Sequence, residues 1–189
     1  MERISRVTLS SAFVGLGVAL GYLFAFIPNV EVISFVAFSS GVILGWRRGT
    51  FTAGLMFLIF AVLNPFGVSP FPLLITQIIG GSIFGLLGGI LRYWLIDRAD
   101  SKALMLLSGL AGVLLTLLYD LLTNLGAYIT IGSPGPLWIF LGAGVTLSLV
   151  HVISNALIFG LLSPTWKLSL IHISEPTRPL YISYAVFCL

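Results

Sequence analysis

The chain of 189 residues contains 58% hydrophobic and only 8% charged residues, with a mean hydropathy of +1.13. Soluble domains carry about 25% charged residues, so this composition excludes an ordinary soluble protein and indicates a surface that faces lipid. In lipid the backbone must be hydrogen-bonded internally, which leaves helices or a closed barrel, and the apolar runs here are continuous rather than alternating. The sequence therefore predicts an all-α integral membrane protein.

Six apolar segments come close to the roughly 20 residues that a helix needs to cross the hydrocarbon layer. They are residues 7–27, 30–45, 50–63, 71–94, 103–125 and 137–162. The second and third are short, and we expect their ends to use flanking turns or a thinned membrane. The predicted fold is a bundle of six transmembrane helices.

The basic residues of this bundle fall on one side of a membrane crossed six times. They are Arg3, Arg6, Arg47, Arg48, Arg92, Arg98, Lys102 and Lys167. The connections on the other side contain no Lys or Arg, and Glu31 is their single charged residue. Because cytoplasmic loops are enriched in basic residues, both termini are predicted to be cytoplasmic. The net charge of +3 then reflects topology and not a nucleic-acid partner.

The segment Leu168–Leu189 differs from the apolar body that precedes it. Its opening, LSLIHISEPTR, and its end, ISYAVFCL, can both be read back into the codons of a transposase-based sequencing adapter. The residues PLY between them fill the frame that a sample barcode would need. We interpret residues 168–189 as translated adapter, with a natural amphipathic tail as the alternative, and exclude them from functional reasoning. The native C-terminus then lies beyond about Lys167 and is missing.

Few residues of the body can support metal binding or catalysis. Cys188 and His172 lie in the terminal segment, which leaves no thiol and one imidazole, His151. Disulfide bonds and Cys/His metal sites are therefore excluded, and no cofactor is predicted. Ser148, His151 and Asp120 could be assembled into a nucleophilic set, but no nucleophile-elbow motif surrounds the serine. The sequence does not predict an enzyme.

Apart from Glu31 at the very start of the second predicted span, Asp120 is the only acidic residue inside a predicted span. A carboxylate at a helix centre costs about 2.5–3.5 kcal/mol on insertion scales, so it usually has a role. Thr116, Thr123 and Asn124 share its helix face. Asp120 is expected about five residues, or roughly 7 Å, below the outer end of its helix. That depth suits the floor of an outward-facing pocket, and the alternative is a hydrogen bond to a neighbouring helix.

Other polar and aromatic residues are predicted at the same outer level. Gln77 follows the start of the fourth span, and Asn64 ends the third. Tyr128 and Trp138 add aromatic faces, as do Phe66 and Phe71, although aromatic residues are also typical of the membrane interface. We predict a substrate-binding set of Asp120, Asn124, Gln77, Asn64, Tyr128 and Trp138.

Ser148, His151 and Asn155 share one face of the sixth span. His151 lies about 14 residues below the outer end, and Asn155 is nearer the cytoplasm, so we interpret this face as interhelical packing rather than ligand binding.

Small residues on other helices predict close packing. Ser11, Gly15 and Ala19 lie four apart on the first helix, and the fourth contains Gly80, Gly81, Gly85, Gly88 and Gly89.

Several of these segments resemble the substrate-binding S components of energy-coupling factor (ECF) transporters, which import vitamins and related micronutrients into prokaryotes. The resemblance covers residues 5–164. It rests on the six-helix size, on PNVEVISFVAFSSGVILGWRRGTFTAGL, on LNPFG followed by PFPLLITQIIGG, and on LYDLLTNLG paired with HVISNALIFGLL. It implies a multi-pass protein of the prokaryotic cell (inner) membrane that binds its ligand near the outer face.

The resemblance also implies partners. These are a transmembrane coupling subunit and a pair of cytosolic ATPases, and the S component topples in the membrane to release its ligand. The chain has no Walker motif, as expected if ATP is hydrolysed by those partners. In this family an AxxxA motif on the first helix contacts the coupling subunit, and Gly15 and Ala19 are its counterpart here, with Gly in place of the first Ala.

Charge narrows the expected ligand. The outer side has Glu31 and Asp120 but no Lys or Arg, so an anionic ligand would lose its hydration without a cationic partner. A neutral or cationic flat ring fits better, although a helix N-terminus or a bound cation could still accommodate an anion. The competing hypothesis is a membrane scaffold of cell-wall elongation, of the MreD type, which would bind protein partners and need no outer pocket.

Overall fold

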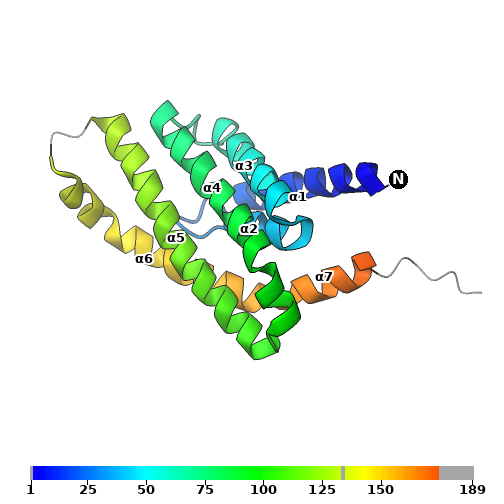
Figure 1. The fold of residues 1–189 in the computed structure, drawn as a ribbon. Helices are drawn as coiled ribbons and strands as arrows, with labels where there is room; N and C mark the ends of the chain where they lie inside the picture. Colours follow the sequence, from blue (N-terminus) through cyan, green and yellow to red (C-terminus); the bar gives the residue numbers. More distant parts are fainter. Residues whose placement is uncertain (1, 133–134, 175–189) are drawn as a thin grey trace, which may run out of the picture.

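The computed structural model describes residues 2–132 and 135–174, and this part of the chain is helical without a β-strand (Figure 1). The all-α prediction is therefore confirmed. The elements are α1 (Glu2–Phe24), α2 (Ile33–Leu44), α3 (Trp46–Val62), α4 (Phe71–Arg92), the π-helical segment η1 (Tyr93–Arg98), α5 (Ser101–Ile131), α6 (Leu137–Leu162) and α7 (Pro164–Ser174).

Four helical stretches are long and apolar enough to cross a membrane. They are Val7–Phe24, Phe71–Arg98, Ser101–Ile131 and Leu137–Leu162. With 12 residues, α2 is shorter than the usual minimum of about 17, and α3, with 17 residues, just reaches it. The membrane character expected from composition is confirmed, whereas six crossings stay a prediction.

The largest difference from the predicted boundaries lies at the C-terminal end of α5. The prediction ended this helix at residue 125, but α5 continues to Ile131. Thr130 does not interrupt it, because its hydroxyl donates back to the Gly126 carbonyl (2.8 Å). The helix ends where Gly132 adopts a left-handed φ of 61°. Asp120 consequently lies about three turns before the C-terminal end of α5, farther from that end than predicted.

The short helix α2 occupies the centre of the bundle. It packs against α1, α3 and α4, and all of its residues except Ile43 and Leu44 are buried. Its sequence, ISFVAFSSGVIL, is apolar on every side, which is typical of a helix without a surface face. The hydroxyls of Ser39 and Ser40 donate to backbone carbonyls of α2 itself. The helix can therefore be buried without leaving these donors unpaired.

The glycines of α4 pack directly against neighbouring helices, as their number predicted. A Cβ on Gly81 would meet the Phe57 ring, and one on Gly85 would meet the Gly49 backbone. These contacts place α4 against α3 at backbone distance. Small residues therefore determine the spacing of the helices that carry the cavity described below.

Gly85→Ala is expected to lower the free energy of unfolding by about 1–3 kcal/mol, because the added methyl would overlap backbone that cannot rotate away. Gly142→Ala is the matched control, since a Cβ there meets no atom within 4 Å. Thermal unfolding in detergent should show a lower midpoint for the first variant alone. Equal midpoints would contradict the close packing of α3 and α4.

The last described helix, α7, is anchored by its first turns. Trp166 is buried, stacks on Phe35 and donates from Nε1 to the Ser39 hydroxyl (2.7 Å). The Lys167 ammonium donates to the Ala99 carbonyl (2.7 Å). Of the segment interpreted as adapter, residues 168–174 continue α7, and residues 175–189 lie outside the described residues.

Truncation after Lys167 is expected to leave the folded yield and thermal midpoint unchanged. The contacts from Trp166 and Lys167 that anchor α7 are retained in the shortened chain. Size-exclusion chromatography of the detergent-purified protein provides the measurement. Trp166→Ala is the contrasting variant and should cost about 3–5 kcal/mol. A clear loss of folded protein on truncation alone would contradict the adapter interpretation.

Candidate functional site

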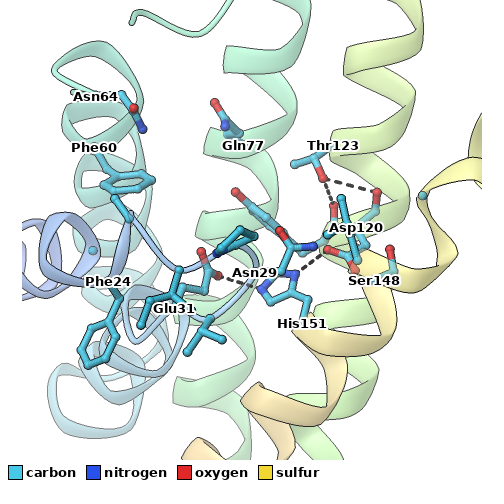
Figure 2. A pocket seen from close by; sticks show the side chains of 18 of the residues that line it. Phe24, Asn29, Glu31, Phe60, Asn64, Gln77, Asp120, Thr123, Ser148 and His151 are labelled. Carbon is cyan, nitrogen blue, oxygen red and sulfur yellow. Dashed lines mark hydrogen bonds and ion pairs between the residues drawn. The ribbon is translucent and has the colours of Figure 1, made fainter. Parts of the chain in front are cut away.

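A cavity of about 440 Å³ lies between the α1–α2 connection and the helices α3 to α6 (Figure 2). Its wall contains Asn64 from the α3–α4 connection, Gln77 from α4, Asp120 from α5 and His151 from α6. The volume falls within the range of small-molecule sites, about 300–1,000 Å³. Among the described residues no Lys or Arg lines this cavity.

The α1–α2 connection, residues 25–32, forms one wall and reaches deep into the bundle. Asn29 adopts a left-handed φ of 56°, and its carbonyl accepts a hydrogen bond from the Ser154 hydroxyl (3.0 Å). Ser154 lies beyond the midpoint of α6, so the connection descends between the helices instead of passing over their outer ends. This descent accounts for the shortness of α2, because the connection supplies the missing length.

At the floor of the cavity, His151 lies between two carboxylates (Figure 2). Its Nδ1 is 2.6 Å from Asp120 Oδ1, and its Nε2 is 3.1 Å from Glu31 Oε1. The same Glu31 oxygen accepts a hydrogen bond from the Ser34 hydroxyl. The group thus joins α5, α6, the α1–α2 connection and the first turn of α2. We call Glu31, Asp120 and His151 the acidic triad.

Charge pairing explains how the acidic triad can be buried. A protonated imidazole carries a proton on each ring nitrogen and can face a carboxylate on both sides. The attraction offsets the loss of hydration, which is large for an isolated charge away from water. With both carboxylates ionised and His151 protonated, the triad has one net negative charge. Within residues 2–132 and 135–174, no set of three His, Cys, Asp or Glu side chains is arranged to hold a metal ion.

Three buried polar atoms of this cavity have no hydrogen-bond partner among the described residues. They are Gln77 Oε1, Asp120 Oδ2 and His151 Nε2. The last faces Glu31 within ion-pair distance but not with hydrogen-bond geometry. A buried polar group left unpaired costs about 1–3 kcal/mol. A ligand that donates to the two oxygens would recover this cost, so the cavity is chemically suited to a donor-bearing molecule.

Four of the six predicted substrate-binding residues line the cavity together: Asp120, Asn124, Gln77 and Asn64. The other two do not. Tyr128 donates its hydroxyl to the Gly135 carbonyl (2.7 Å), and the Trp138 side chain is 72% exposed. Tyr128 lies near the end of α5, and Trp138 lies at the start of α6. Because α5 is longer than predicted, both positions are farther from the cavity floor than expected.

The predicted substrate-binding set omits several polar lining residues, among them Glu31, His151 and Ser148. The sequence contained a signal for the first two, because Glu31 is the single charged residue of the outer connections and His151 the only imidazole of the body. His151 also makes the interhelical hydrogen bond that was the alternative role for Asp120. Asn155 donates to Thr116 (2.8 Å), a bond between α6 and α5 of the kind expected for this face.

In comparisons with known proteins, no family model, no curated protein and no solved structure matches the chain.

Proposed function

We propose that the chain is the substrate-binding S component of an ECF-type importer, which captures a vitamin or related micronutrient near the outer membrane face for ATP-driven uptake. The observation that carries the proposal is the polar cavity with the acidic triad at its floor. Buried ionisable groups within membrane spans commonly mark substrate or ion sites. The energy would come from a coupling subunit and two cytosolic ATPases.

The proposal includes six crossings of a prokaryotic inner membrane with both termini in the cytoplasm. The descent of residues 25–32 supplies length that α2 alone lacks. The cavity lies toward the α3–α4 connection, which contributes Phe66, whereas Arg47 and Arg92 lie at the opposite ends of α3 and α4. Under the positive-inside rule this arrangement supports an outward-facing cavity.

A free face of α1 supports the proposed contact with a coupling subunit. Gly15 and Ala19 are exposed, and a Cβ on Gly15 would meet no atom of the described residues within 4 Å. The glycines that do pack inside the bundle are Gly17, against Met56, and Gly21, against Phe60. The helix therefore presents one small-residue face to α3 and leaves another open for a partner helix.

A scaffold of cell-wall elongation is the competing function. Such a protein would bind partner proteins and would need no outer cavity with buried acceptors. The polar cavity with the acidic triad at its floor favours a small-molecule site over a purely structural bundle. Purification from a prokaryotic host, followed by mass spectrometry of released small molecules, separates the two. A protein that carries no ligand, and supports no vitamin uptake when produced with a coupling subunit and ATPases, would contradict the importer.

Asp120→Asn and Asn124→Leu are each expected to weaken binding of the copurified vitamin by about 10- to 100-fold, the range for losing a hydrogen bond to a charged group. Asn at position 120 keeps an oxygen for His151, so the bundle should stay folded. Isothermal titration of the purified variants provides the measurement. Tyr128→Phe, outside the cavity, is the control. Unchanged affinity with reduced stability would assign Asp120 and Asn124 to helix packing.

A further inference from the structure

A second cavity, of about 750 Å³, lies between α1 and α3. We call it the α1–α3 groove. Its walls are mainly apolar and include Val14 from α1 together with Phe51, Leu55 and Ile59 from α3. Arg47 and Arg48 lie at one end, where α3 begins. The groove is separate from the polar cavity, because the two share no lining residue.

The groove exists because α1 touches α3 along only half of its length. Contact is close at Gly17, where a Cβ would meet Met56, and at Gly21, where it would meet Phe60. The Tyr22 hydroxyl adds a hydrogen bond to the Ile59 carbonyl (3.4 Å). Toward its amino terminus, α1 leaves the bundle (Figure 1). The apolar side chains on that half of α1 therefore face a gap rather than a neighbouring helix.

The charged end of the groove has no counterion among the described residues. Arg47 and Arg48 are exposed, and neither pairs with an acidic side chain among the described residues. The Arg47 guanidinium lies over the Trp46 ring, 4.9 Å from its centroid. Tryptophan and arginine are typical of the level of the lipid headgroups. Arg47 and Arg48 thus place two positive charges at one end of an apolar channel.

We propose that the α1–α3 groove binds one anionic phospholipid, with its phosphate at Arg47 and Arg48 and one acyl chain along Phe51, Leu55 and Ile59. The length of the groove matches that of an acyl chain in one leaflet. The stretch of α3 from Arg48 to Ile59 rises by roughly 17 Å, and one leaflet of the hydrocarbon layer is about 15 Å thick. The net charge also favours an anionic lipid, since a zwitterionic headgroup would bring a third positive charge beside the two arginines. This site goes beyond the proposed importer function and does not depend on it.

The test uses the detergent-purified chain and native mass spectrometry, with phosphatidylglycerol and phosphatidylcholine of identical acyl chains as probes. The wild-type protein should retain one phosphatidylglycerol in about 30-fold preference, as expected for two basic residues near a membrane surface. The double variant Arg47→Gln, Arg48→Gln should lose this preference. Ser10→Trp should displace the lipid by filling the groove, because Ser10 lines it.

Arg98→Gln is the matched control. Arg98 is also exposed, stacks its guanidinium on a neighbouring ring (5.3 Å to the centroid of Tyr93) and lies outside the groove. If Arg98→Gln lost the preference for phosphatidylglycerol to the same extent, the preference would come from the overall charge of the protein. That result would contradict a specific site in the groove. The proposal would also be overturned if the wild-type protein showed no preference for phosphatidylglycerol. It would be overturned as well if Ser10→Trp left the amount of bound phosphatidylglycerol unchanged. A groove filled by a helix of a coupling subunit, with no lipid retained, would also overturn the proposal.

Discussion

Replacing His151 by leucine is expected to lower the free energy of unfolding by about 3–5 kcal/mol, the cost of removing one partner from a buried ion pair. The ring nitrogens lie 2.6 Å from Asp120 and 3.1 Å from Glu31, so a single substitution leaves two carboxylates without a counterion. Leucine has a similar volume, so the loss should come from charge and not from an empty space. Thermal unfolding in detergent measures the effect.

The control for this prediction is a triple variant that removes every charge of the acidic triad: Glu31→Gln, Asp120→Asn and His151→Leu. It should be more stable than His151→Leu alone, because no uncompensated charge remains. Hydrogen exchange adds a local readout, since loss of the His151 contact should increase exchange in residues 25–32, which the triad holds against α6. A single variant as stable as the wild type would contradict the charge-paired arrangement.

Much of the fold follows from local patterns in the sequence. Continuous apolar runs predicted the positions of α1 to α6, and the segment predicted at residues 137–162 coincides with α6. The end of α5 could not be predicted from the outer polar residues, because Thr130 satisfies its hydroxyl within the helix. The buried position of Trp166 depends on Ser39 and Phe35, which lie far away in the sequence. Such a contact leaves no local pattern.

The candidate site was likewise predictable only where it depends on residues close together in the sequence. The helical period places Asp120 and Asn124 on one face, so their convergence could be predicted from sequence. The role of Glu31 could not, because it depends on the descent of the α1–α2 connection and on a hydrogen bond between Asn29 and Ser154. His151 was assigned to packing because depths were counted from separate helix ends. The structure instead brings it to Asp120 on the neighbouring helix.

Gly15→Trp and Ala19→Trp are expected to reduce vitamin uptake by more than about 10-fold while ligand binding stays within about twofold of wild type. The reason is that both residues are exposed on α1 and no atom lies within 4 Å of a Cβ on Gly15. A bulky side chain there would block the backbone approach of a coupling subunit without disturbing the bundle. The polar cavity uses the other end of α1, at Gly21 and Phe24, so binding should be spared. Uptake into cells that also produce the coupling subunit and ATPases provides the measurement.

Gly17→Trp is the control that separates this surface from the packed face of the same helix. A side chain at Gly17 would overlap Met56, so this variant should lose fold, binding and uptake together. The proposed importer function therefore predicts two classes of substitution in this part of α1. Those at Gly15 and Ala19 abolish transport alone, and the one at Gly17 abolishes folding. A scaffold protein would show no vitamin uptake to lose. Normal uptake by Gly15→Trp and Ala19→Trp would show that this face of α1 does not contact the coupling subunit.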